Sequence, residues 1–145
     1  MESIILKIKD IVEKHPNKIA IQCNDKLMTY KELDIFSDYI AHNLLNFISR
    51  GQIIGVHIYK DEEFIPIIIA LWKIGCAYVP LDKDVDYERI NYIIKDAKIN
   101  YVISDVLEKE INANIINKYE ITKRTKIQEL SRIYIKDDEI CYIIY

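Results

Sequence analysis

The sequence predicts an α/β fold: a parallel-rich sheet with helices on both faces, and a small antiparallel hairpin near the N-terminus. Two observations predict it. Between residues 53 and 104, short β-branched or apolar runs alternate with segments of helical periodicity, which is the pattern of right-handed crossovers between parallel strands. Half of the 145 residues are hydrophobic and no Pro/Gly-rich linker interrupts them, so we expect one domain with its own core.

The N-terminal region predicts a helix followed by the hairpin. Apolar residues recur at helical spacing over residues 4–12, and this helix should end before Pro16, because proline disfavours helix in the residue that precedes it. Two apolar runs, 18–24 and 27–30, then flank the turn pair Asn24-Asp25. They predict antiparallel strands joined by a turn longer than the tightest kind.

The second helix has a start signal. Thr29 can accept a hydrogen bond at the helix N-terminus while Glu32 reaches back from three residues later, the arrangement called a capping box. Apolar residues line one face of this helix: Leu33, Phe36, Ile40 and Leu44. The helix is expected to end near Ser49-Arg50-Gly51.

The third helix follows a buried β-branched strand predicted at residues 53–59. Asp61 is the expected N-cap of this helix, with Glu62-Glu63 favourable beside the positive helix end. Four apolar residues then recur at helical spacing: Ile65, Ile68, Ile69 and Trp72. Gly75 is expected to end the helix in the left-handed conformation.

The alternation continues beyond this helix. Asp86 is an expected N-cap. The remaining predicted elements are strands at 77–81 and 101–104, a helix at 86–97, a short helix and then a strand near 119–121, and strands at 134–135 and 140–145.

Several motifs resemble those of one enzyme family. Residues 28–33 (Met-Thr-Tyr-Lys-Glu-Leu) are similar to LTYxEL, and residues 71–82 (Leu-Trp-Lys-Ile-Gly-Cys-Ala-Tyr-Val-Pro-Leu-Asp) are similar to LKAGxAYVPLD. Residues 88–104 resemble ERIxxxLxDAxxxxVIT, and residues 139–145 resemble DLAYVIY. These motifs are typical of adenylate-forming (AMP-binding) enzymes, above all the amino-acid-activating adenylation domains of nonribosomal peptide synthetases.

The departures from these motifs concern packing. Trp72, Ile74 and Val85-Asp86 replace the family's common residues. They bear on the subfamily, because helix packing and a loop tolerate such changes.

The resemblance implies a fold and a chemistry. The fold is that of the N-terminal subdomain of acyl-adenylate synthetases. In the family, a carboxylate attacks the α-phosphate of MgATP to give an acyl adenylate and pyrophosphate, and a thiol, often phosphopantetheine on a carrier protein, then takes the acyl group. The family's phosphate loop, nucleotide contacts, substrate pocket and catalytic lysine correspond to positions after Tyr145.

Residues 1–145 are therefore expected to be an incomplete N-terminal subdomain that is inactive alone. We assign no catalytic, cofactor-binding or metal-binding residue in it. ATP and Mg are implied for the complete enzyme. The implied partners are the remainder of the adenylation domain and the phosphopantetheine carrier protein.

The residues themselves give no motif for phosphate or metal binding. The glycines at 51, 55 and 75 form neither GxGxxG nor GxxxxGK[ST]. Residues 82–86 alternate aspartates as a calcium loop does, but Tyr87 stands where that loop needs glycine, and Ile93 where it needs glutamate. A basic cluster (Lys118, Lys123, Arg124 and Lys126) is expected to be a solvated face.

The histidines and Cys76 are not expected to be reactive groups. His15 is expected at a helix end, His42 at the surface, and His57 in a strand with local hydrogen bonding. Cys76 follows a helix C-terminus, where the dipole raises the pKa of a thiol, so a reactive thiolate is not expected there.

Charge and cysteine usage limit the partners and the compartment. The net charge of -3, with both signs interspersed, argues against nucleic acid or an anionic membrane as a partner. No apolar stretch is long enough to span a membrane, and the start of the chain lacks a secretory pattern. Three widely separated cysteines fit a reduced, cytoplasmic setting.

Two rival interpretations stay open. One is a naturally truncated, non-catalytic scaffold that binds a partner; the other is a fragment of a D-alanine-carrier ligase or an acyl-CoA synthetase. Reading the coding frame past Tyr145 separates a ligase, which would continue into a TSGSTGxPKG-like loop, from a scaffold, which would stop. Ile140, Ile143 and Ile144 are expected to be exposed, so self-association is also predicted.

Overall fold

A computed structural model describes residues 3–107, 109–124 and 143. Within them the order of elements is α1 (Ile4–Lys14), β1 (Ile19–Cys23), β2 (Lys26–Thr29), α2 (Tyr30–Leu44), β3 (Ile53–His57), α3 (Phe64–Lys73), β4 (Ala77–Pro80), α4 (Tyr87–Asp96), β5 (Tyr101–Ser104), β6 (Asn114–Asn117) and α5 (Lys118–Ile121). The predicted α/β class and the antiparallel N-terminal hairpin are confirmed.

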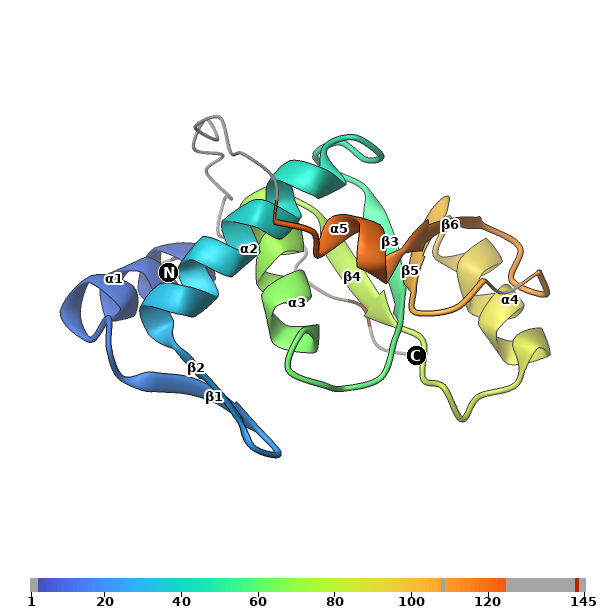
Figure 1. Cartoon of the computed structure of the whole chain (residues 1–145). Helices are drawn as coiled ribbons and strands as arrows, with labels where there is room; N and C mark the ends of the chain where they lie inside the picture. Colours follow the sequence, from blue (N-terminus) through green and yellow to red (C-terminus); the bar gives the residue numbers. More distant parts are fainter. Residues whose placement is uncertain (1–2, 108, 125–142, 144–145) are drawn as a thin grey trace.

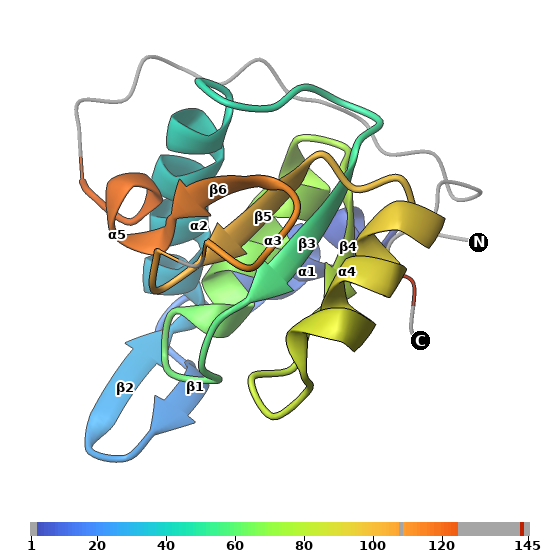
Figure 2. The same cartoon turned by 90° about the vertical axis from the view of Figure 1, so that its right-hand side faces the viewer.

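The central sheet is parallel and has the order β4-β3-β5-β6 (Figures 1 and 2). The chain crosses from β3 to β4 through α3, and from β4 to β5 through α4. Helices α2 and α3 lie on one face of the sheet and α4 lies on the other (Figure 1). The predicted arrangement of helices on both faces is therefore confirmed.

The core has two parts because successive side chains of a strand point to opposite faces. Ile54 and Val56 of β3 pack with α2 and α3 in one cluster. Val102 of β5 packs with Ile90 of α4 in the other. A sheet buried on both faces explains why its strands are nearly continuous apolar runs.

Gly55 lies in the middle of β3, where no side chain fits. A Cβ at this position would lie 2.8 Å from Leu81 Cδ1 and 2.9 Å from Val102 Cγ2. The missing side chain therefore allows neighbouring side chains to pack directly on the β3 backbone.

Gly75 ends α3 as the sequence predicts. Its φ is 75°, in the left-handed region. Gly75 N–H donates to Trp72 O at 3.0 Å, and Cys76 N–H donates to Leu71 O at 2.9 Å. These two bonds form a Schellman motif, which satisfies carbonyls at the helix end and turns the chain into β4.

Two predicted helix caps are also confirmed. Thr29 Oγ1 accepts from Glu32 N–H at 3.2 Å, and Glu32 Oε1 accepts from Thr29 N–H at 3.4 Å, so the capping box of α2 is present. Asp86 Oδ1 accepts from Arg89 N–H at 2.8 Å and caps α4.

The hairpin turn is shorter than predicted. Cys23 pairs with Lys26, so Asn24 and Asp25 alone form the turn. Asn24 adopts a φ of 53°, a left-handed conformation that asparagine tolerates better than most residues. This conformation allows the chain to reverse within two residues.

Helix α2 is shorter than predicted. It ends at Leu44 and not near Ser49-Arg50-Gly51. The next turn tightens, because Asn46 N–H and Phe47 N–H donate to carbonyls three residues earlier. Hydrogen-bond geometry in this turn, which no side-chain periodicity reveals, decides the boundary.

Helix α3 begins later than predicted, at Phe64. Asp61, the predicted N-cap, lies one turn earlier, and its Oδ1 accepts from Glu63 N–H at 2.9 Å. The aspartate therefore stabilises the turn that leads into the helix and not the helix terminus itself.

The predicted order of a helix and then a strand after Asp105 is wrong. The structure has β6 first, where Ile116 is buried and aligns with Ile103 of β5. Asn117 Oδ1 then accepts from Tyr119 N–H at 2.9 Å and begins α5. Asparagines that interrupt the apolar pattern thus flank a short edge strand and cap a helix.

The C-terminal predictions fall mostly outside the described residues. These are the strands predicted at 134–135 and 140–145, of which Ile143 alone is described. Ile143 was expected to be exposed. Instead it is half-buried against the α4 side of the core, and its N–H donates to Tyr78 O at 3.0 Å.

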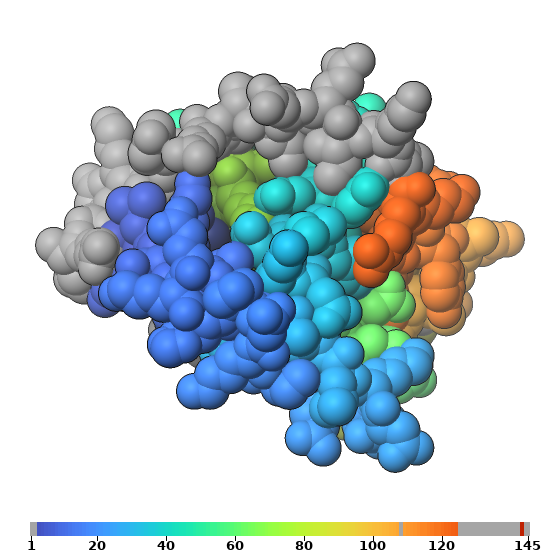
Figure 3. Space-filling model, turned by 60° about the vertical axis from the view of Figure 1, so that its left-hand side comes forward, coloured from blue at the N-terminus to red at the C-terminus, as the bar shows by residue number. Residues whose placement is uncertain are grey.

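The N-terminal helix packs beside the α2 layer. Figure 3 shows α2 between α1 and α5 on one face of the molecule. Among the described residues, no helix has both the length and the apolar character needed to cross a membrane.

Candidate functional site

The carboxyl edge of the parallel sheet is the candidate site. In open α/β sheets, ligands bind beyond the carboxyl ends of the strands, where neighbouring strands lead to opposite faces. Here the chain leaves β3 toward α3 on one face. After β5 it runs past Ile111, which packs on the α4 face. The switch point therefore lies between β3 and β5.

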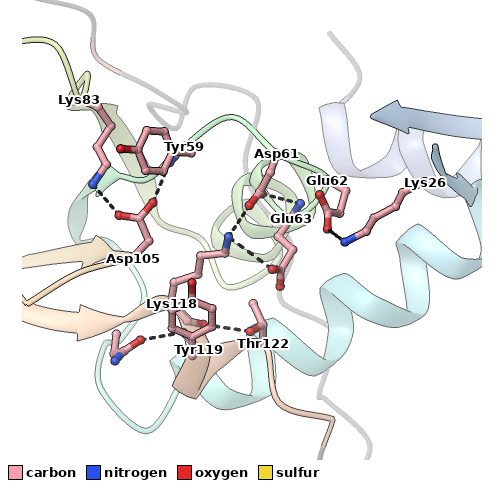
Figure 4. Close-up of polar contacts among 11 residues, drawn as sticks. Lys26, Tyr59, Asp61, Glu62, Glu63, Lys83, Asp105, Lys118, Tyr119 and Thr122 are labelled. Carbon is pink, nitrogen blue, oxygen red and sulfur yellow. Dashed lines mark hydrogen bonds and ion pairs between the residues drawn. The ribbon is translucent and has the colours of Figure 1, made fainter. Parts of the chain in front are cut away.

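Asp105 occupies this switch point (Figure 4). Its Oδ2 accepts from the backbone N–H of Tyr59, which follows β3, at 3.0 Å. Its Oδ1 accepts from Lys83 Nζ, which follows β4, at 2.5 Å. The Lys83 ammonium also lies 4.9 Å from the centre of the Tyr59 ring. One carboxylate thus connects the ends of three strands.

The electrostatics of this contact favour an ionised aspartate. The Asp105 side chain is 6% exposed and the Lys83 side chain 15% exposed. Burial by itself raises the pKa of Asp105, but hydrogen bonds from Lys83 and Tyr59 N–H outweigh burial and hold that pKa below its ordinary value.

Lys118 forms a second ion pair at the same edge. Its Nζ lies 2.6 Å from Asp61 Oδ2 and 3.3 Å from Glu63 Oε1, and its side chain is 4% exposed. Burial lowers the pKa of Lys118, but the hydrogen bond to Asp61 and the charges of both carboxylates outweigh burial and raise it. The prediction that this lysine lies on a solvated face is wrong, because β6 and α5 bring it against the β3–α3 loop.

A third pair is largely exposed. Lys26 at the hairpin contacts Glu62 of the β3–α3 loop (Figure 4). Their hydrogen bond raises the pKa of Lys26 and lowers that of Glu62. The Lys26 side chain is 71% exposed, so water screens this pair more than the other two.

An open groove lies between the hairpin and the start of α3. Its volume is about 430 Å³, and Ile21, Phe64, Ile65 and Tyr78 are among the residues that line it. Asp61, which is already bound to Lys118, lies at its rim. The groove therefore presents mainly apolar surface.

His57 and Cys76, the two buried candidates for a reactive group, both form hydrogen bonds with backbone carbonyls. His57 lies in β3 and is buried, as expected of a strand residue that packs, but its Nδ1 lies 2.8 Å from Leu81 O, which is 24 residues further along the chain and not local. Burial raises the pKa of the Cys76 thiol, whose Sγ donates to Ser49 O at 3.2 Å. The predicted direction for Cys76 is confirmed, although burial and not the helix dipole is the main cause.

Cation ligands do not gather in the described part of the chain. The structure shows no group of three or more His, Cys, Asp or Glu there that could hold a metal ion. In the predicted calcium-like run, Asp82 and Asp84 are exposed and Asp86 caps α4.

The carboxyl edge does not fit the phosphates of ATP. Each lysine labelled in Figure 4 is paired with a carboxylate, namely Asp61, Glu62, Glu63 or Asp105, so these charges neutralise one another. A phosphate would meet carboxylates beside each lysine and would have to displace internal hydrogen bonds. No step of nucleotide chemistry can be derived from these residues.

Asp105, Lys83 and Lys118 were not predicted to be members of this edge. A signal for Asp105 existed, since a single aspartate directly after a buried parallel strand must lie at the carboxyl edge. No local pattern identified its lysine, because 22 residues separate the two.

Comparison with known proteins defines the class. A profile of the AMP-binding enzyme family matches residues 8–145. The chain therefore belongs to the AMP-binding enzymes, a family that uses ATP and Mg. Within that family it is similar to adenylation domains of nonribosomal peptide synthetases.

Peptide synthetases are among the similar sequences. Tyrocidine synthase 2 of Brevibacillus parabrevis is 30% identical over 141 residues, which cover 94% of this chain and 4% of the relative. N-(5-amino-5-carboxypentanoyl)-L-cysteinyl-D-valine synthase of Penicillium rubens is 35% identical over 92 residues, which cover 63% of this chain and 2% of the relative. The chain thus spans a small part of these relatives.

Solved structures show the same fold. The N-terminal subdomain of Klebsiella oxytoca NpsA superimposes with a TM-score of 0.90 at 20% identity, covering 98% of this chain and 38% of that chain. NpsA in complex with 3-hydroxyanthranilyl-AMSN gives a TM-score of 0.91 at 20% identity, covering 98% and 30%.

Proposed function

We propose that residues 1–145 form the N-terminal subdomain of an amino-acid-activating adenylation domain. The complete enzyme joins a carboxylate to the AMP portion of ATP, releases pyrophosphate, and transfers the acyl group to a phosphopantetheine thiol. The observation that carries this proposal is the family match over residues 8–145, which includes both core motifs.

In that enzyme this chain has a structural role, and we assign it no catalytic, cofactor-binding or metal-binding residue. Gly75 ends α3 and directs the chain into β4, while Asp105 and Lys118 join the strand ends by internal ion pairs. Each lysine labelled in Figure 4 is already paired with a carboxylate and is therefore not available to bind phosphate. We expect the chain alone to be inactive.

Amino-acid activation is favoured over related reactions by the sequence relatives, which include Ferrichrome siderophore peptide synthetase of Mycosarcoma maydis, 30% identical over 156 residues and covering 99% of this chain. The fold does not discriminate. O-succinylbenzoate coenzyme A synthetase of Bacillus subtilis has a TM-score of 0.80 at 18% identity, covering 87% of this chain and 34% of that chain. An acyl-CoA synthetase or a D-alanine-carrier ligase therefore stays the alternative.

The proposed partners are the remainder of the adenylation domain and a carrier protein. One similar solved structure is an artificially fused adenylation–PCP di-domain, NpsA-ThdA of Klebsiella oxytoca, which supports the carrier proposal. Self-association is proposed from exposed apolar side chains such as Leu27 and Ile65. A monomeric sedimentation profile over a wide concentration range would contradict it. A cytoplasmic location is proposed from the three widely separated cysteines of the sequence, which suit a reducing compartment.

The experiment compares two products of the coding region. Residues 1–145 should give no amino-acid-dependent ATP–pyrophosphate exchange with any amino acid. If the coding frame continues into a phosphate loop, the longer product should give exchange with at least one. Exchange by residues 1–145 would refute the inactive role, and a native stop codon after Tyr145 would favour the scaffold alternative.

A further inference from the structure

The contact at the switch point has the geometry of an anion-binding site. The two oxygens of Asp105 are bound separately, Oδ2 by the Tyr59 N–H at 3.0 Å and Oδ1 by the Lys83 ammonium at 2.5 Å. A charged donor together with a backbone N–H is a common way in which proteins bind small oxyanions.

The backbone that carries each donor is held without the help of the Asp105 side chain. Tyr59 follows β3, whose backbone is paired on both sides by β4 and β5. Lys83 lies in the turn that leads to α4, where Val85 N–H donates to Asp82 O at 3.2 Å. When the carboxylate is removed, the two backbone segments should therefore stay in place, and the Lys83 ammonium keeps its contact with the Tyr59 ring.

Burial makes an empty site costly. Without Asp105, the Lys83 ammonium, whose side chain is 15% exposed, would keep the Tyr59 ring as its remaining contact within the described part of the chain. The exposed Tyr59 N–H would also lose its acceptor, but water can replace it. The cost therefore comes mainly from the Lys83 ammonium, because a largely buried charge without a partner is strongly unfavourable, and a small anion from solution would restore that partner.

We propose that Tyr59 N–H and Lys83 form a small-anion site at the β3/β5 switch point, and that the protein's own Asp105 carboxylate is its resident ligand. The class of external ligand that fits is a small carboxylate such as formate or acetate. The site lies where related sheet architectures bind their ligands. Because the Asp105 carboxylate occupies the site, anions from the solvent cannot bind there.

Chemical rescue tests the proposal. Asp105→Ala should lower the midpoint of thermal unfolding. Formate or acetate, with chloride keeping the ionic strength constant, should raise the midpoint of this variant with the logarithmic concentration dependence of single-site binding, but leave wild type unchanged. At a rescuing anion concentration ten times its Kd, the folding equilibrium constant should rise about tenfold.

Two variants provide the controls. Asp38→Ala removes another carboxylate bound to a lysine, but Lys73 keeps Asp34 at 2.8 Å, so formate should not raise the unfolding midpoint of this variant. Asp105→Ala combined with Lys83→Met should lose the response of the single variant. If Asp105→Ala fails to fold, the yield of refolding from urea with and without formate gives the same comparison.

The proposal would be overturned by either of two results. One is a response of Asp105→Ala no larger than that of Asp38→Ala. The other is an equal response after Lys83 is replaced, because formate would then act on the protein in general and not at this site.

Discussion

Lys118 is the most deeply buried charge at the carboxyl edge, and replacing it isolates the contribution of its ion pairs. Lys118→Met keeps an unbranched, largely apolar side chain and removes the ammonium. Asp61 and Glu63 then lose a cation that lies 2.6 Å and 3.3 Å from their oxygens. We expect the variant to fold but to be clearly less stable.

The magnitude follows from burial. Breaking a fully buried pair costs about 3–5 kcal/mol, because a charge is left without its partner. Here the carboxylates stay 33% and 23% exposed, so water solvates them in part. We therefore expect a loss of roughly 2–3 kcal/mol in the free energy of unfolding, or about 7–10 °C in the unfolding midpoint of a chain this size.

Urea unfolding measured by tryptophan fluorescence is a suitable assay. Trp72 is the single tryptophan of the sequence and lies on α3, which follows the loop that Lys118 contacts. The matched control is Lys26→Met, which removes a lysine from the same acidic loop. Its side chain is 71% exposed, so water screens its ion pair, and its loss should lower the free energy of unfolding far less than the loss of Lys118 does.

The reasoning would fail if the two lysine variants were equally stable. A second check removes the charges together. Lys118→Met combined with Asp61→Asn and Glu63→Gln should recover part of the lost stability, because no uncompensated carboxylate remains. No recovery would mean that Lys118 contributes through packing of its stem and not through its charge.

The remaining predictions concern the packing at Gly55, the helix end at Gly75, the reactivity of Cys76 and the pH dependence that Asp105 contributes to stability. Gly55→Ala should cost about 1–3 kcal/mol in urea unfolding, because its Cβ would lie within 2.9 Å of two packed side chains; unchanged stability would mean that the sheet relaxes easily. Gly75→Ala should cost about 1 kcal/mol, because alanine is strained at a φ of 75°, whereas Gly75→Asn should cost less; equal losses would contradict this backbone explanation. Cys76 should be alkylated more slowly than Cys23 in the native protein, as followed by peptide mass spectrometry, because burial raises its pKa and limits access; similar rates would place Cys76 at the surface. The pKa of Asp105 is lowered in the folded state, so its charge stabilises the protein above the ordinary carboxyl pKa of 3.8, and this contribution is lost as the pH falls through the lower folded pKa. The difference in unfolding free energy between wild type and Asp105→Asn should therefore shrink below pH 3.8. A difference that stays constant would refute the assignment.

Much of the fold could be predicted because its signals are local. The capping box of Thr29 and Glu32 spans one helical turn, and the stop at Gly75 needs a single residue that accepts a positive φ. The strands from β3 to β5 were predicted because burial on both faces requires apolar residues throughout. The boundaries that failed, such as the end of α2 at Leu44, depend on backbone hydrogen bonds that composition does not encode.

The candidate site could be predicted only in part. An aspartate such as Asp105, directly after a parallel strand, belongs at the carboxyl edge of the sheet whatever its partner. Its lysine, and the burial of Lys118, depend on which loops meet at that edge. Lys118 lies in a basic run of the sequence that is typical of a solvated face. Its partner Asp61 is 57 residues away, so no local pattern indicates that Lys118 is paired and buried.

The sequence by itself determined the α/β class, the order of elements through β5 and the membership of the AMP-binding family, because periodicity, helix ends and motif spacing are properties of neighbouring residues. The tertiary structure decided that the motif residues build a scaffold whose charged edge is neutralised from within. The reason is physical: the sheet order β4-β3-β5-β6 differs from the chain order, so loops far apart in sequence meet at one edge, and burial there allows Lys83 and Lys118 to remain charged only beside carboxylates.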